Sequence, residues 1–243
     1  MKCRKFAAAL MAICAAALGA GAAATTAPSV RAPNIRLRAG TSTNWAGYAT
    51  SGAPGTFTNV SGSWTQPSVT CGAQNAYSAY WVGLDGDNSS TVEQLGTEAD
   101  CVGGAAVYSS WYEMYPHRSS NAFLPVSPGH TYQASVVALG GGSFRLSLQD
   151  VTAGTNPFVT IQKLNQARLS SAEAIVEAPS GPGVLPLANF GTANFRGVTA
   201  NATTMTSPPA EQINMVNSTG TTKALTSKLS ARGSFSVTWN AAQ

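Results

Sequence analysis

After Asn44 the 243-residue chain has no convincing helical stripe of apolar residues, and this constrains its fold more than any other feature. Apolar residues instead form short alternating runs between clusters of Gly, Pro, Asn and Ser. Such runs are typical of one large all-β domain, a sandwich or a barrel. We expect strands at 57–66, 77–84, 91–98, 106–115, 131–139, 144–151, 158–164, 172–178, 188–198 and 234–239.

The N-terminal residues have the pattern of a cleavable signal peptide. Three basic residues precede an apolar run that begins at Phe6 and ends at Leu18, and small residues follow. This run is shorter than the about 20 residues that a membrane-spanning helix needs. We therefore expect a secreted protein, free of the membrane once processed, with a signal peptide at 1–24, a linker or short pro-segment at 25–40 and one domain at 41–243.

The positive charge of the chain lies in its N-terminal part. From residue 41 onward, 8 Lys and Arg residues stand against 10 Asp and Glu residues, a net charge of −2. Nucleic-acid-binding proteins carry a basic patch on the working domain. The sequence therefore argues against a nucleic-acid partner.

Cysteine usage predicts one disulfide. Cys3 and Cys14 lie in the signal peptide, so Cys71 and Cys101 remain in a chain exported to an oxidising compartment. We expect these two to be bonded. Closing a loop of this length stabilises the fold by roughly 3 to 4 kcal/mol through loss of unfolded-state entropy.

Several common catalytic devices are missing from the sequence. It contains no Gly-x-Ser-x-Gly, no His-Glu-x-x-His, no phosphate-binding glycine loop and no Cys-x-x-Cys. His117 and His130 have no obvious nucleophile as partner, and we expect surface or core roles for both. We predict no metal site and no cofactor.

Polar residues inside predicted strands are the remaining candidates for chemistry. They are Gln94, Glu113 and Glu177. Because side chains alternate along a strand, Glu173 shares a face with Glu177. That face is either exposed to solvent or the lining of a cleft, and periodicity does not decide between the two.

Six ordered motifs of this chain resemble the glutamic peptidases, or eqolisins, a family of pepstatin-insensitive acid proteases. They are NWAGY at 44–48, GSWTQPSV at 62–69, YWVGLDG at 80–86, TVEQLG at 91–96, WYEMYP at 111–116 and AEAIVE at 172–177. The resemblance implies an antiparallel β-sandwich of two large sheets, one of them curved to hold the active-site cleft and a polypeptide substrate.

The resemblance also implies a catalytic pair. Gln94 matches the family glutamine and Glu177 the family glutamate, while Trp81, Asp85 and Glu113 match residues that line or brace the site. A glutamate, with a pKa of about 4.3 in water, can take a proton from water and return it to the leaving amine in acid. A glutamine amide can hold the water and stabilise the tetrahedral oxyanion.

Three departures from the fungal members bear on pH and specificity. Glu93 replaces a leucine, Ala174 a tryptophan and Ser109 an aspartate. We expect a monomeric secreted acid endopeptidase, or a relative that prefers near-neutral pH. The alternative function is a non-catalytic carbohydrate-binding or adhesive β-sandwich, since aromatic residues such as Trp81 and Trp111 commonly stack on sugars.

Overall fold

Residues 36–38, 40–206 and 209–243 are described in a computed structural model of the chain. The predicted signal peptide at 1–24 lies outside the described residues, as does most of the predicted linker. The described residues form strands, turns and bends, and none is in a helix. Accordingly, these ranges hold no helix of the length and apolarity that a bilayer crossing requires.

All ten predicted runs are strands in the structure, with bounds that differ by a few residues. The elements are β1 Arg36–Arg38, β2 Thr41–Ser42, β3 Trp45–Ser51, β4 Asn59–Thr65, β5 Ala79–Asp85, β6 Val92–Val102, β7 Ala105–Tyr115, β8 Ser120–Asn121, β9 Thr131–Gly140, β10 Ser143–Asp150, β11 Phe158–Lys163, β12 Ser171–Glu177, β13 Thr192–Ala200, β14 Thr203–Thr204, β15 Glu211–Val216, β16 Thr222–Thr226 and β17 Phe235–Trp239.

The strands pair into one continuous hydrogen-bonded sheet. One ladder runs β8-β7-β6-β5-β12-β3-β15, and the other runs β11-β10-β9-β4-β13-β17-β16-β15. The pairings within both ladders are antiparallel, which confirms the all-β antiparallel prediction. Because β15 belongs to both ladders, the hydrogen bonding joins them, rather than leaving two separate sheets as expected.

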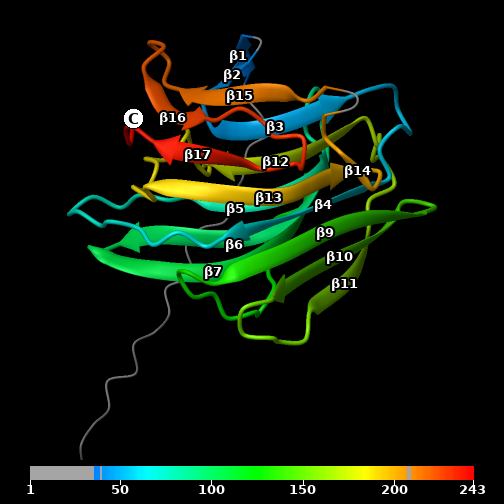
Figure 1. Cartoon of the computed structure of the whole chain (residues 1–243), viewed down its shortest axis with the longest axis horizontal. Coiled ribbons are helices and arrows are strands. Elements are labelled where there is room, and N and C mark those ends of the chain that lie inside the picture. Colours follow the sequence, from blue (N-terminus) through cyan, green and yellow to red (C-terminus); the bar gives the residue numbers. More distant parts are fainter. Residues whose placement is uncertain (1–35, 39, 207–208) are drawn as a thin grey trace, which may run out of the picture.

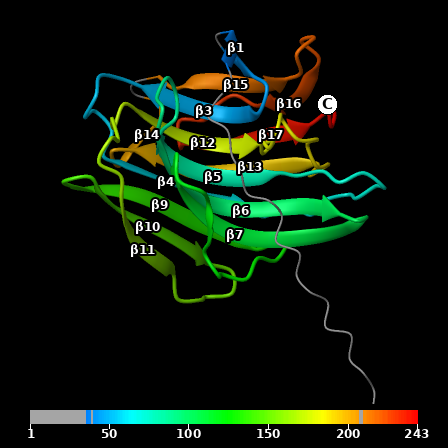
Figure 2. The ribbon, with the colours of Figure 1, turned by 180° about the vertical axis from the view of Figure 1, so that it is seen from behind.

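The two ladders pack against each other through a common core. The Trp64 indole of β4 donates from Nε1 to Thr97 Oγ1 of β6 at 2.8 Å. Tyr48 of β3 packs edge-on against Phe235 of β17, with 5.0 Å between ring centroids. In Figures 1 and 2 the strands run across the view, from β15 and β3 at the top to β11 at the bottom. The sheet therefore folds over onto itself and encloses the main core.

The predicted disulfide is present. Cys71 and Cys101 are joined, with an S–S distance of 2.00 Å and a sequence separation of 30. Cys101 lies near the end of β6, and Cys71 lies in the connection between β4 and β5. The bond therefore ties this connection to the strand that carries Gln94.

Candidate active site

The face of the β3-β12-β5-β6-β7 ladder turned away from the main core carries the predicted site residues in register. Gln94 of β6 pairs with Gly83 of β5 on one side and with Glu113 of β7 on the other. Gly83 pairs in turn with Glu173 of β12. Paired residues project on the same side of a sheet. Two glutamates, a glutamine and a glycine thus form one row across four strands.

Two further rows follow on the same face, at intervals of two residues. Ile175, Trp81, Gly96 and Trp111 form the next row, and Trp45, Glu177, Ala79, Glu98 and Ser109 form the third. Gln94 and Glu177 therefore share a face but lie in different rows.

The amide of Gln94 is oriented by Glu113. Gln94 Nε2 donates to Glu113 Oε2 at 2.7 Å, and the two residues are 3% and 2% exposed. Gln94 Oε1 is also buried, and no hydrogen-bond donor among the described residues reaches it. The acceptor oxygen of Gln94 is thus left for a small polar group from outside the described protein.

Glu177 is held by an indole. Trp81 Nε1 donates to Glu177 Oε2 at 2.8 Å, and both side chains are buried. Trp45, which pairs with Glu177 in the β3-β12 ladder, packs edge-on against Trp81 with 4.9 Å between ring centroids. The carboxylate therefore has a fixed direction on this face.

Two glycines make room for the Trp81 indole. A Cβ on Gly83 would lie 3.0 Å from Trp81 Cζ3 and 3.0 Å from Gln94 Cβ. A Cβ on Gly96 would lie 2.7 Å from Trp81 Cβ and 2.0 Å from the Tyr80 carbonyl oxygen. Any side chain at these positions would displace Trp81 or Gln94, so both glycines are part of the site's shape.

Glu173, which lies on the same face as Glu177, is in a different environment. It is fully buried, and the Asp87 N–H donates to its Oε1 at 3.3 Å. Burial raises the pKa of Glu173 well above its ordinary value. A hydrogen bond from Ser171 lowers this pKa, whereas the negative charges of Asp87 and Asp85 raise it further. Burial therefore favours the neutral, protonated form of Glu173.

Asp85 braces a loop rather than the catalytic pair. Its carboxylate accepts hydrogen bonds from the backbone N–H groups of Arg168, Leu169 and Ser170 at 2.7, 2.8 and 2.8 Å, and from Ser170 Oγ at 3.0 Å. These residues lead directly into β12, which ends at Glu177. Asp85 thus fixes the start of the strand that carries the glutamate.

Residues 43–239 match the family described as the Peptidase A4 family. The chain belongs to this family. It is 33% identical over 137 residues to scytalidopepsin B of Scytalidium lignicola, a match that covers 55% of this chain and 51% of that relative. The chain thus spans about half the length of the curated relative that it matches.

Solved structures of glutamic peptidases share the fold. Scytalido-glutamic peptidase, crystallised with a transition state analog inhibitor, superimposes with a TM-score of 0.69 at 24% identity, over 82% of this chain and 98% of that chain. Aspergilloglutamic peptidase from Aspergillus niger gives 0.60 at 24% identity, over 68% and 99%. At these identities the likeness establishes the architecture of this Peptidase A4 chain.

Two residues of the same face were missed from the sequence. Glu98 follows Gln94 and Gly96 at intervals of two, and its Oε2 accepts from Ser109 Oγ at 2.9 Å. Trp45 begins β3. Residues on both faces of this strand are buried, so the alternation of buried and exposed side chains is not visible there. The period of two after Gln94 was a signal that could have identified Glu98.

The aromatic residues considered for sugar binding are not exposed. Trp81 and Trp111 are 0% and 3% exposed, and Tyr112 stacks on Phe158 with 5.7 Å between ring centroids. These three residues therefore offer no exposed stacking platform in the complete chain.

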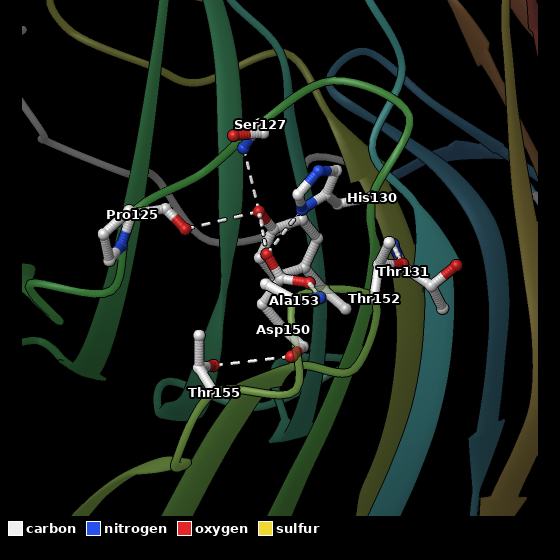
Figure 3. A network of polar contacts seen from close by, with 9 residues as sticks. Pro125, Ser127, His130, Thr131, Asp150, Thr152, Ala153 and Thr155 are labelled. Atoms are coloured by element: carbon white, nitrogen blue, oxygen red, sulfur yellow. Dashed lines mark hydrogen bonds and ion pairs between the residues drawn. The ribbon is translucent and has the colours of Figure 1, made fainter.

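The two histidines of this Peptidase A4 chain lie away from Gln94 and Glu177. His117 is exposed after β7. His130 Nδ1 lies 2.7 Å from Asp150 Oδ2, which also accepts from the Tyr132 hydroxyl at 3.2 Å (Figure 3). Burial opposes ionisation of Asp150, but hydrogen bonds from the Ala153 N–H and His130 outweigh it and lower the pKa. This network ties the end of β10 to the segment before β9, as expected for a structural histidine.

No group of three or more His, Cys, Asp or Glu side chains in the described ranges has a geometry suited to a metal ion.

Proposed function

We propose that the processed chain is a secreted endopeptidase that hydrolyses peptide bonds of unfolded polypeptides in acid, with Gln94 and Glu177 as the catalytic pair. The observation that carries the proposal is the buried Gln94 Oε1, which has no donor from the protein and lies on the face that also carries Glu177. Membership of the Peptidase A4 family supports polypeptides as substrates.

In this mechanism Glu177 is the base and then the acid. Its carboxylate takes a proton from a water molecule whose oxygen attacks the scissile carbonyl carbon. It then returns that proton to the leaving nitrogen as the C–N bond breaks. Trp81 Nε1 donates to Glu177 Oε2 and orients the carboxylate for the proton exchange.

Gln94 binds both the attacking water and the oxyanion that forms from the scissile carbonyl. Its Oε1 accepts a hydrogen bond from the water, and the Nε2 hydrogen that is not donated to Glu113 faces the developing oxyanion. A donor in this role typically stabilises the transition state by about 2.7 to 4 kcal/mol. An amide does not titrate, so Gln94 keeps this function throughout the acidic range.

The raised pKa of Glu173 supports Glu177 as the base. A carboxyl group that remains protonated is a far weaker base than a carboxylate, so it does not take up the proton of the attacking water. Glu173 fits a supporting role, in which it receives the Asp87 N–H and holds the turn after β5.

The boundaries predicted from the sequence complete the proposal. Residues 1–24 direct export, residues 25–40 form a basic linker or pro-segment, and residues 41–243 form the peptidase domain, which acts as a monomer without a cofactor. The segment 25–40 carries Arg31, Arg36 and Arg38, and its cleavage offers a way to delay activity until export.

The test uses the processed protein, obtained by expressing the whole chain, with a denatured protein as substrate between pH 2 and 8. We expect internal cleavage that is strongest in acid and unchanged by pepstatin. Gln94→Ala should lower kcat by about 10²- to 10³-fold while the thermal melt stays intact. Absence of cleavage at every pH, or full inhibition by pepstatin, would overturn the proposal.

A further inference from the structure

Trp45 carries a buried hydrogen-bond donor that the proposed mechanism does not use. The side chain is 1% exposed, lies beside Glu177 in the β3-β12 ladder and packs against Trp81. Among the residues that the structure describes, its Nε1 has no acceptor. A buried polar group without a partner costs about 1 to 3 kcal/mol, so such a group calls for an explanation.

Three other indoles of the chain have acceptors. Trp64 Nε1 donates to Thr97 Oγ1 at 2.8 Å, Trp81 Nε1 to Glu177 Oε2 at 2.8 Å, and Trp239 Nε1 to the Leu187 carbonyl oxygen at 3.3 Å. The unpaired nitrogen of Trp45 is thus not a general property of tryptophans in this fold. It occurs on the face that carries the catalytic pair.

Close packing fixes the Trp45 ring in place. A Cβ on Gly86 would lie 2.9 Å from Trp45 Cη2, so the outer edge of the indole fits against a residue without a side chain. Gly47, two residues after Trp45, has a φ of +146°, and a Cβ there would lie 2.2 Å from the Ala174 carbonyl oxygen. The direction of the Nε1–H bond is therefore set before any ligand arrives, which reduces the entropy lost on binding.

We propose that Trp45 Nε1 donates a hydrogen bond to a backbone carbonyl oxygen of the bound polypeptide, next to the bond that Glu177 helps to cleave. An indole N–H donates only and does not titrate, so it can bind a neutral acceptor in acid as well as at neutral pH. Carbonyl oxygens are the acceptors that every extended polypeptide offers. Trp45 thus recognises the main chain, whatever the substrate's side chains. This inference rests on the proposed function.

The test replaces only the indole N–H group of Trp45. In Trp45→3-benzothienylalanine a sulfur atom takes the place of the N–H and the ring keeps its shape. With a peptide substrate that the wild-type protein cleaves, we expect kcat/KM to fall about tenfold, with an unchanged pH profile. The melting temperature should stay the same or rise, because the replacement removes a buried unpaired donor.

A matched control is the same replacement at Trp239, whose Nε1 has an acceptor in the protein. There we expect a lower melting temperature and an unchanged kcat/KM. A purely structural Trp45 would instead leave kcat/KM unchanged on replacement, as expected for Trp239.

A set of peptides then locates the acceptor. In each peptide one carbonyl near the scissile bond is replaced by a methylene group. One of them should be cleaved with equal kcat/KM by the wild-type protein and the Trp45 variant, because the contact is already lost. If the wild-type protein cleaves peptides and the Trp45 variant matches it on all of them, the inference fails alone. If the wild-type protein cleaves no peptide, the proposed function fails and this inference with it.

Discussion

Gln94 and Glu113 face each other directly across β6 and β7, and the Gln94 amide nitrogen donates to Glu113 Oε2 at 2.7 Å. This contact decides which end of the amide is oxygen and which is nitrogen at the site. A carboxylate accepts hydrogen bonds only, so Glu113 selects the orientation that leaves Gln94 Oε1 for water. Glu113 therefore positions the amide of Gln94, the glutamine of the proposed catalytic pair.

Glu113→Gln should remove the preference of the Gln94 amide for one orientation. A glutamine at 113 can donate as well as accept, so the Gln94 amide is free to adopt both orientations. We expect kcat to fall by about 10- to 100-fold, since misplacement of a catalytic group by about 1 Å costs up to 10²-fold. KM and the melting temperature should change little. Equal kcat values for variant and wild type would contradict a positioning role.

Glu93 should make the fold less stable as the pH rises. Burial raises its pKa to about 9 from 4.5, and the negative charge of Asp85 adds to the shift. A carboxyl group whose folded pKa is raised contributes full stability below its unfolded pKa and loses it as the pH rises through the folded value. Glu173 shifts in the same direction.

Two groups have a lowered rather than a raised pKa, and they change the stability of the fold only outside the range from pH 4.5 to 8. Asp150, with its pKa lowered from 3.8, changes stability only in stronger acid. Lys223, whose pKa burial lowers from 10.5 to about 8, does so only above about pH 8. Between pH 4.5 and 8 the free energy of unfolding should therefore fall with rising pH, by up to about 1.4 kcal/mol per pH unit for each glutamate.

Denaturant unfolding of wild type and Glu93→Leu at pH 5 and pH 8 measures this effect. Leucine at 93 removes the buried carboxyl, so the variant should show a smaller loss of stability between the two pH values and be the more stable protein at pH 8. A wild-type stability that rises with pH, or an identical pH dependence in Glu93→Leu, would show that Glu93 does not titrate as described.

Removal of the disulfide should destabilise the protein without changing its chemistry. Replacing Cys71 and Cys101 together by alanine opens a loop with a separation of 30 residues. We expect the free energy of unfolding to fall by roughly 3 to 4 kcal/mol. At temperatures where the variant is folded, kcat should equal that of the wild type. A lower kcat in the folded variant would mean that the bond also positions β6 and Gln94.

Local pattern was enough to predict strands whose two faces differ, such as β9 and β10. It failed at β3, where residues 45–50 are buried on both faces and no alternation is visible. The short β15 was also missed, and it is the strand that joins the two ladders. The hydrogen bonds of β15 therefore link the two ladders, which no local pattern indicated.

The sequence was enough to name candidate site residues but not their contacts. Gln94 and Glu177 were identified from motifs that resemble a known family. The bond from Trp81 to Glu177 joins residues 96 positions apart and depends on the register of β5 against β12, which no local pattern encodes. Trp45 was noted only as part of a motif, because its unpaired nitrogen is a property of the packed structure.

The central proposal is that Glu177, and not Glu173, is the general base. It is tested most directly by the kcat of two matched variants on one peptide at acidic pH. Glutamine replaces each glutamate in turn, which removes the titrating group and keeps the shape. We predict that Glu177→Gln lowers kcat by about 10⁴-fold, the upper range for loss of a general acid–base, and that Glu173→Gln stays within about tenfold of the wild type. A Glu177→Gln variant that remains active while Glu173→Gln is inactive would contradict the account.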